Sequence, residues 1–185
     1  DLPGLGQTWS TPTPLRARIG SGVGQNERLL ALAFGAGYDT LQDDGPYTAD
    51  TQGNGIFMID ALSGNTLWRA GSSGGANFTS EDFTNSIVSD IRALELSRDG
   101  LTDRLYATDV GGQLWRFDLW NGEAAENFAT GGVIASLGGA ANQTNPIENR
   151  RFYYAPDAAL VTGRAGSRFM HLGVGSGYRA HPLDK

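Results

Sequence analysis

Short apolar runs separated by glycine-rich turns recur along the chain. Three of them begin with arginine and end in small residues and glycine: RLLALAFGAGYD (28–39), RLYATDVGGQ (104–113) and RFMHLGVGSGYR (168–179). Apolar runs of this length that end at glycine are typical of buried strands leading into turns that need a positive φ angle. The pattern predicts an all-β chain in which one structural unit is repeated.

Other elements recur around these runs in the same order. A strand with an Asp, followed by Gly four residues later, occurs as GIFMIDALSGN (55–65) and QLWRFDLWNGE (113–123), with Asp60 equivalent to Asp118. An Asp side chain can cap such a turn, so both are predicted to close a hairpin. A further strand is expected before each Arg-led run, at 9–19, 85–96 and 152–161. An outer strand is expected at the end of the first two units, at 65–71 and 131–139.

Units of about four antiparallel strands repeated in sequence predict a β-propeller, with a β-sandwich of similar strands as the alternative. The expected blades span about residues 9–75 and 85–140, with a partial third blade at about 150–185. Because propellers use about four to eight blades, two and a half to three blades are expected to be part of a larger propeller. The third unit lacks its outer strands, which predicts an exposed apolar edge at FMHLGVGSG (169–177) and reliance on neighbouring blades.

Composition narrows the possible functions. The 185 residues include no Cys, which excludes disulfides, Cys-ligated zinc and a thiol nucleophile. The formal net charge of −6, from 14 Lys and Arg against 20 Asp and Glu, argues against nucleic acid as a partner. No apolar run approaches the roughly 18 residues that span a bilayer. The chain opens without Met or a signal peptide, as expected for a mature product or an excised piece.

The ordered set of phrases resembles the C-terminal β-propeller of the PilC/PilY family, large bacterial proteins of the tip and biogenesis of type IV pili. The similarity extends from about Trp9 to Asp184 and rests on GNGIFMIDALSGNTLW, SDIRALELSRDGLTDRLYATDVGGQLWRFDL, GGVIASLGG, RRFYYAPDAALV and GSGYRAHPLD. The resemblance implies export through the periplasm to the outer membrane, cell surface or pilus tip. It also implies a role in pilus extension and retraction, adhesion and twitching motility. The implied partners are minor pilins, the remaining blades and a host or surface receptor.

The resemblance also implies a calcium loop before the second Arg-led strand. Members of the family carry the pattern D-x-D-x-D-G-x-x-D followed by R-x-Y, and calcium takes about six to eight oxygen ligands from such alternating positions. The sequence departs from this pattern by Glu at the first position, by Ser at the third and by the cation of Arg98, each of which weakens the site. A plain turn between two strands is the alternative. The matching ligands are Glu95, Ser97, Asp99, the Leu101 carbonyl and Asp103.

Three further features have simpler explanations. A second acidic stretch between Asp39 and Asp50 could hold a cation, but a solvated insertion loop is favoured. His171 lies in an apolar strand, where a core imidazole is favoured over a metal ligand; His181 has no metal-ligand spacing. Three tryptophans are predicted to pack between blades, and Trp9 could do this or stack on a ligand: Trp68, Trp115 and Trp120.

The favoured function is therefore a non-enzymatic, calcium-responsive pilus factor. The main rival is a quinoprotein dehydrogenase, whose blades carry similar Ala-x-Asp-x-x-x-Gly-x-x-x-Trp phrases, as in MIDALSGNTLW (58–68). Such an enzyme needs pyrroloquinoline quinone and calcium, and the sequence shows no adjacent cysteines and no clear Asp base. A propeller scaffold without any metal is the second rival.

Overall fold

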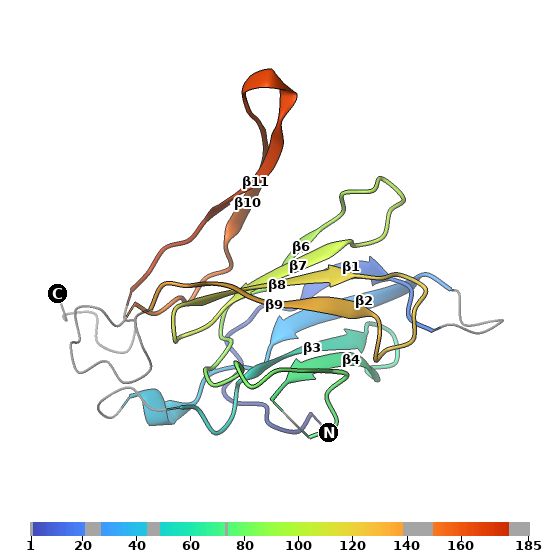
Figure 1. The fold of residues 1–185 in the computed structure, drawn as a ribbon. Helices are drawn as coiled ribbons and strands as arrows, with labels where there is room; N and C mark the ends of the chain where they lie inside the picture. The colour runs from blue at the N-terminus through green and yellow to red at the C-terminus, as the bar shows by residue number, and fades with distance from the viewer. Residues whose placement is uncertain (1, 21–26, 44–48, 73, 139–149, 178–185) are drawn as a thin grey trace.

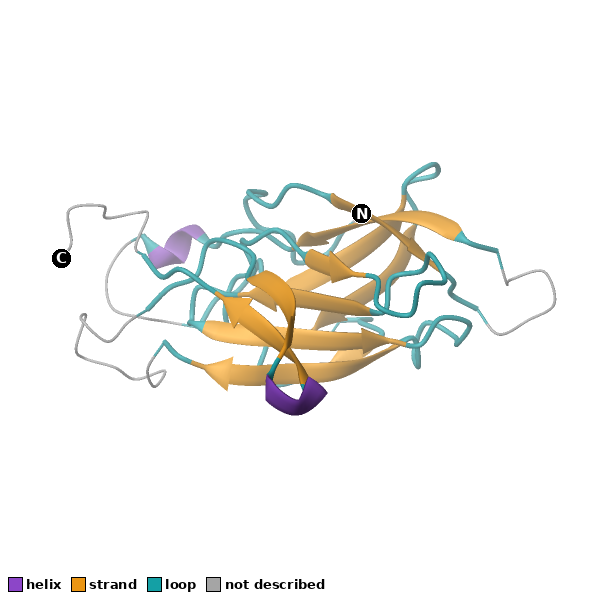
Figure 2. Cartoon of the chain, turned by 90° about the horizontal axis from the view of Figure 1, so that it is seen from above, coloured by secondary structure: helices purple, strands orange, loops and turns teal. Residues whose placement is uncertain are grey.

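The computed structural model describes residues 2–20, 27–43, 49–72, 74–138 and 150–177. Its strands form three sheets of five, four and two strands. The two larger sheets lie against each other, and the hairpin β10–β11 projects away from them (Figure 1). Figure 2 shows the same strands from above, where loops and two short 3-10 segments make up the rest of the described chain. Among the described residues, no helix is long and apolar enough to cross a membrane.

The first sheet is a meander of four antiparallel strands with a short fifth strand added at its outer edge. The fifth strand differs from the expected unit because it runs parallel to its neighbour. The backbone N–H of Asn77 donates to the Arg69 carbonyl, and the Asn77 side chain accepts from the Arg69 N–H, at 2.9 and 3.0 Å. These two bonds hold the returning chain beside the edge strand. The strands are β1 (Thr13–Ala17), β2 (Leu29–Gly35), β3 (Gly55–Asp60), β4 (Thr66–Gly71) and β5 (Phe78–Thr79).

The second and third sheets repeat the beginning of this order. In each of the three sheets the Arg-led run supplies the second strand, as the sequence predicts. The predicted all-β fold of consecutive antiparallel blades is confirmed, and among the described residues the sheets do not close a ring, which is consistent with part of a larger propeller. The strands are β6 (Arg92–Leu94), β7 (Arg104–Thr108), β8 (Gln113–Leu119), β9 (Ala129–Ser136), β10 (Asp157–Thr162) and β11 (Arg168–Gly173).

The register of the repeat differs from the one that the arginines suggest. Ala31 of β2 pairs with Asp60, and Arg104 of β7 pairs with Asp118. Because Asp60 and Asp118 are equivalent, Arg104 occupies the place of Ala31 and not that of Arg28. The strands correspond, but the arginines themselves do not.

The main core lies between the first and second sheets. Trp68 from β4 is fully buried and meets Phe117 of β8 edge-to-face at 5.8 Å. Trp115 is equally buried and stacks on Phe83 at 4.1 Å. Each buried aromatic side chain of this kind contributes about 1.5–3 kcal/mol by leaving water. The predicted packing role is thus confirmed for these two tryptophans.

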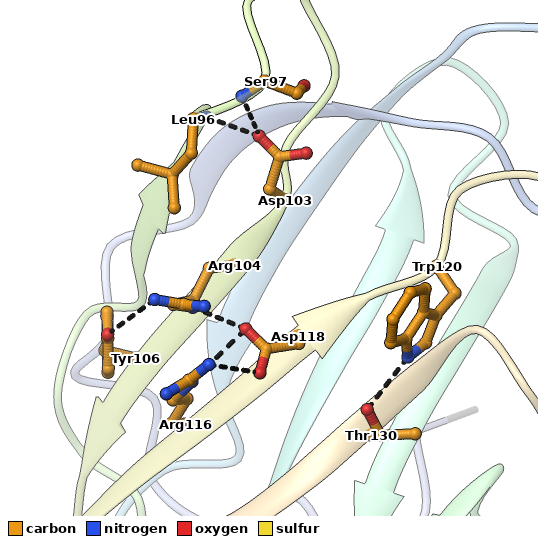
Figure 3. Close-up of polar contacts among 9 residues, drawn as sticks. All are labelled: Leu96, Ser97, Asp103, Arg104, Tyr106, Arg116, Asp118, Trp120 and Thr130. Atoms are coloured by element: carbon orange, nitrogen blue, oxygen red, sulfur yellow. Dashed lines mark hydrogen bonds and ion pairs between the residues drawn. The ribbon is translucent and has the colours of Figure 1, made fainter.

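The other two tryptophans are partly exposed. Trp120 is 54% exposed and donates its indole N–H to the Thr130 hydroxyl at 2.9 Å, so the prediction that it packs between blades is wrong (Figure 3). Trp9 stacks on Tyr38 with ring centroids 4.7 Å apart, which favours packing over a free stacking platform.

The ends of the second acidic stretch are buried, in contrast to the solvated loop that was expected. The Asp39 carboxylate accepts hydrogen bonds from the backbone of Leu41 and from the backbone and hydroxyl of Thr51. Asp50 accepts from the Gln42 side chain at 2.6 Å and from the Ser86 N–H at 2.5 Å. These bonds tie the insertion to the segment that leads into the second sheet. Asp44 lies outside the described residues.

A third buried carboxyl closes the turn between β7 and β8. Asp109 accepts from the Trp115 indole at 2.8 Å and from the backbone N–H groups of Gly111 and Gln113 at 3.0 and 2.9 Å. Burial raises the pKa of Asp109 to about 7, although these hydrogen bonds favour the ionised form. The carboxyl has a structural role as the acceptor that fixes the hairpin and the Trp115 ring.

The projecting hairpin is exposed, as predicted for the incomplete third unit. Leu160 and Phe169 are 58% and 50% exposed. His171 is exposed as well, so the prediction of a core imidazole is wrong, and His181 lies outside the described residues. The chain before the hairpin is attached to the second sheet, where the Thr108 hydroxyl donates to the Tyr154 carbonyl at 2.8 Å.

Candidate functional site

The predicted calcium ligands lie on the loop between β6 and β7. Two of its residues have left-handed backbone conformations: Arg98 with φ 66° and Gly100 with φ 79°. This conformation is common for Gly and uncommon for other residues, so the tight turn at Arg98 is strained. The segment from Glu95 to Gly100 is exposed, whereas the Leu101 side chain is buried. Leu101 therefore fixes the loop to the core at its end.

Hydrogen bonds within the loop occupy two of the predicted carboxylates. Asp103 accepts from the backbone N–H groups of Leu96 and Ser97, the latter at 2.8 Å (Figure 3). Asp99 accepts from the Ser97 hydroxyl at 3.0 Å and from the Leu101 N–H at 2.8 Å. These bonds from Leu101 and Ser97 lower the pKa of Asp99, and the nearby cations Arg28 and Arg18 add to the effect.

The loop does not have the geometry of a ready calcium centre. Within the described part of the chain, no three Asp, Glu or His side chains come together as metal ligands do. A Cβ on Gly100 would lie 3.4 Å from the Arg28 guanidinium, so a cation already stands beside the loop. Both amides bind Oδ2 of Asp103, so calcium would have to be bound by the other carboxylate oxygen, Oδ1, or displace these two bonds. Binding by Glu95, Ser97, Asp99, Leu101 and Asp103 therefore stays a prediction.

The same loop is connected to the first sheet. The Thr102 N–H donates to the Arg16 carbonyl at 2.8 Å. The Asn121 amide donates to the Thr102 carbonyl at 2.8 Å and accepts from the Arg18 N–H at 2.9 Å, and the Gly122 N–H donates to the Arg18 carbonyl at 2.7 Å. The chain that leaves β1 is thus bonded both to the loop and to the β8–β9 turn. A movement of the loop would therefore also displace the end of β1.

A second group of polar side chains lies beside the loop on the face of β7 and β8. The Asp118 carboxylate binds Arg104 Nε at 2.5 Å and Arg116 Nη2 at 2.6 Å (Figure 3). Partial burial alone would raise the pKa of Asp118, but the bonds from the two guanidinium groups outweigh this effect and lower the pKa. The Arg104 guanidinium also lies over the Tyr106 ring, 6.0 Å from its centre. Two cations share one carboxylate here, which leaves the face positive.

Asp118 does not have the role that the repeat predicts. Asp60 does cap its turn and accepts from the N–H groups of Leu62 and Ser63 at 2.9 and 2.6 Å. Asp118 instead faces the arginines that strand pairing brings to either side of it. The sequence gives a weak signal for this cluster, because residues 104, 116 and 118 become neighbours only through pairing of β7 with β8.

The charged group borders a pocket of about 360 Å³ on the outer strands of the second sheet. Its walls are the side chains of Arg116 and Asp118 and the β9 segment from Gly131 to Ile134. This pocket was not predicted from the sequence. The Gly131-Gly132 pair within a strand is the only signal that could have indicated it, since glycine in a strand often marks a close approach of another group.

Successive antiparallel sheets packed face to face define a propeller-type β protein. Among solved structures, the C-terminal domain of Pseudomonas aeruginosa PilY1 shares this fold, with a TM-score of 0.58 and 22% sequence identity. The likeness covers 95% of this chain and 34% of that chain, so the chain spans about a third of that structure. The expected fold of the PilC/PilY propeller is thereby confirmed. No family model and no curated protein matches the chain.

Proposed function

We propose that the chain is part of the propeller of a type IV pilus-associated protein that supports pilus extension and retraction, adhesion and twitching motility. The observation that supports this most is the fold likeness to PilY1, which covers 95% of the chain. The ordered sequence phrases from Trp9 onwards support it independently. The protein would act at the bacterial surface, at the pilus tip or the outer membrane, after export through the periplasm.

The proposed role is binding and assembly rather than catalysis. Two buried carboxylates of the described chain form structural hydrogen bonds: Asp50 accepts from the Ser86 N–H and Asp109 from the Trp115 indole. Minor pilins and the remaining blades would be the partners within the pilus, and a host or surface receptor the partner outside it. An absorption spectrum of the purified protein tests the rival enzyme, since a bound quinone would contradict the proposed role.

The test in cells is deletion of the segment in the bacterium that encodes it. We expect fewer surface pili and a smaller twitching zone, both restored by the intact gene. Normal piliation and twitching after deletion would contradict the proposal. A variant with Leu62→Ala, an exposed turn residue that is 90% accessible, serves as the control and should behave as wild type.

Calcium responsiveness is a further part of the proposal. The loop before β7 offers only oxygen donors, which suit a hard cation, and its link to Arg16 gives a path by which calcium could act on the first sheet. Calorimetry should detect calcium binding to the wild type that is lost when Asp99→Ala and Asp103→Ala are combined. Equal binding by both proteins would place calcium elsewhere, and no binding at millimolar calcium would favour the plain turn. Glu126→Gln, outside the loop, is the matched control and should retain calcium binding.

A further inference from the structure

Strand pairing places one row of residues across the first sheet in correspondence with one row across the second, when Asp60 is aligned with Asp118. One row across the first sheet joins Thr13, Ala33, Met58 and Trp68. The equivalent row across the second sheet joins Arg92, Tyr106, Arg116 and Gly132. Gly132 thus occupies the position of Trp68, and Arg116 that of Met58.

In the first sheet this row faces the second sheet. Met58 and Trp68 are fully buried, and the Trp68 ring meets Phe117 of β8 and Phe128, which directly precedes β9, at 5.8 and 6.3 Å. Phe117 itself belongs to the opposite face of the second sheet, because side chains alternate along β8. The row with Arg116 and Gly132 therefore points away from the first sheet, toward the place of the next blade.

The chain begins to occupy that place. The Thr108 hydroxyl donates to the Tyr154 carbonyl, and Arg92 Nε donates to the Pro156 carbonyl at 3.1 Å. Arg92 also lies 3.5 Å from Asp157, the first residue of β10. These contacts attach the third unit to the inner strands β6 and β7 of this face. The outer strands β8 and β9 carry the pocket.

The pocket cannot be filled from its own sheet by a residue at the position of Trp68. Gly132 has φ 150°, which side chains rarely adopt, and a Cβ there would meet nothing within 4 Å. A Cβ on Gly131 would lie 2.0 Å from the Arg116 carbonyl oxygen. The β9 backbone therefore disfavours any residue other than glycine at both positions. The space beside Arg116 stays open as a result.

We propose that this pocket receives a large aromatic side chain from the sheet that packs on the face of β7, β8 and β9, namely the completed third blade. We expect an aromatic occupant because the interface between the second sheet and the third blade repeats the one between the first two sheets. There the indole of Trp68 fills the equivalent space. The wall formed by Arg116 favours the same chemistry, since a guanidinium whose edge is bound by Asp118 leaves its flat face for stacking. Between the first two sheets, the aromatic side chain Trp68 comes from the earlier sheet of the pair. In the proposed interface it would come from the later sheet, the third blade.

The test uses the chain itself and three capped tripeptides, with tryptophan, leucine or aspartate between two threonines. Binding is followed by the NMR signals of the Arg116 Nε–H and the Gly132 and Ile134 amides. We expect the tryptophan peptide to bind with a dissociation constant of about 1–10 mM and to shift all three signals through its ring current. The leucine peptide should bind severalfold more weakly, and the aspartate peptide should leave the signals unchanged.

Two variants test the location. Arg116→Met removes the guanidinium and Ile134→Asp places a charge at the rim, where the side chain is 49% exposed, so both should weaken binding severalfold. Arg69→Met, which removes an arginine lying over Phe57 on the other face of the first sheet, should have no effect. Stronger binding of the aspartate peptide, shifts at other residues, or no binding would overturn the proposal. The same signals could instead shift when the protein is concentrated without any peptide, with dimers detected by sedimentation. That result would identify a second copy of the chain as the occupant and would also overturn the proposal.

Discussion

The matching faces of the first and second sheets share their backbone arrangement and differ in chemistry. Where the first sheet has Ala31, Met58 and Trp68, the second has Arg104, Arg116 and Gly132. These three residues of the first sheet are fully buried, whereas the charged face contains a pocket and partly exposed arginine side chains. The order and pairing of the strands are thus shared between the two repeats, whereas the turns, the bulges and the side chains on each face differ.

The comparison also shows how a charged face is kept stable. Arg104 and Arg116 both bind Asp118, so neither cation lacks a carboxylate. The pair is partly open to water, and a bond of this kind contributes about 0–1 kcal/mol. In the first sheet the equivalent Asp60 lies at the end of β3 and caps a turn. One conserved Asp position therefore serves two different purposes.

The largest effect on stability is expected when Met58 is replaced by arginine, the residue at the equivalent position of the second sheet. Met58→Arg places a cation at a fully buried position between two packed sheets, where Asp60, the equivalent of Asp118, already accepts two hydrogen bonds from its own turn. A buried unpaired charge costs more than about 4 kcal/mol, enough to unfold a marginally stable chain. Far-UV circular dichroism and urea unfolding measure this. A folded variant of unchanged stability would show that the two faces tolerate the same residues.

A smaller but still large effect is expected at Trp68. Trp68→Ala leaves a cavity against Phe117 and Phe128, which should lower the free energy of unfolding by about 3–5 kcal/mol. Trp120→Ala provides the control, because this side chain is 54% exposed, and should change stability by about 1 kcal/mol or less. Equal losses in urea unfolding would mean that burial does not distinguish the two positions.

The smallest effect is expected from the reverse exchange on the second sheet. Arg116→Met removes one of two guanidinium groups at Asp118 and leaves Arg104 in place, so unfolding should change by no more than about 1 kcal/mol. Thermal unfolding at low and high salt provides the measurement, since screening weakens a partly exposed ion pair. The variant should show less salt dependence than the wild type, and a loss of several kcal/mol would contradict this account.

Much of the fold could be predicted from the chain's pattern of apolar runs and turns. The Arg-led runs supply the second strand of each sheet, and Asp60 caps its turn. The shift that places Arg104 opposite Asp118 could not be predicted, because an arginine near the start of a strand does not fix which residue it pairs with. The parallel strand β5 depends on the paired bonds of Asn77 with Arg69, which no local pattern indicates.

The candidate site was predictable in position and less so in detail. The resemblance located the loop before β7, but the amides that occupy Asp103 and the guanidinium beside Gly100 depend on tertiary placement. The burial of Asp50 likewise depends on Ser86, which lies 36 residues away in sequence. His171 was misjudged because an apolar strand in a projecting hairpin has no core to enter. The pocket beside Gly132 arises from an absent side chain, which composition does not reveal.

The hydrogen bonds that connect the residues flanking β1 to the second sheet have a consequence for the order in which the chain folds. Each larger sheet is built largely from neighbouring strands, so its contacts are local and form early. The bond between Arg18 and Asn121 joins residues 103 apart, and the bond between Thr11 and Asp90 joins residues 79 apart. Closing such long loops carries a larger entropic cost. β1 can therefore pair with β2 early, but the bonds of its flanking residues form only after the second sheet exists. During synthesis, the bond to Asn121 cannot form until residue 121 has emerged from the ribosome.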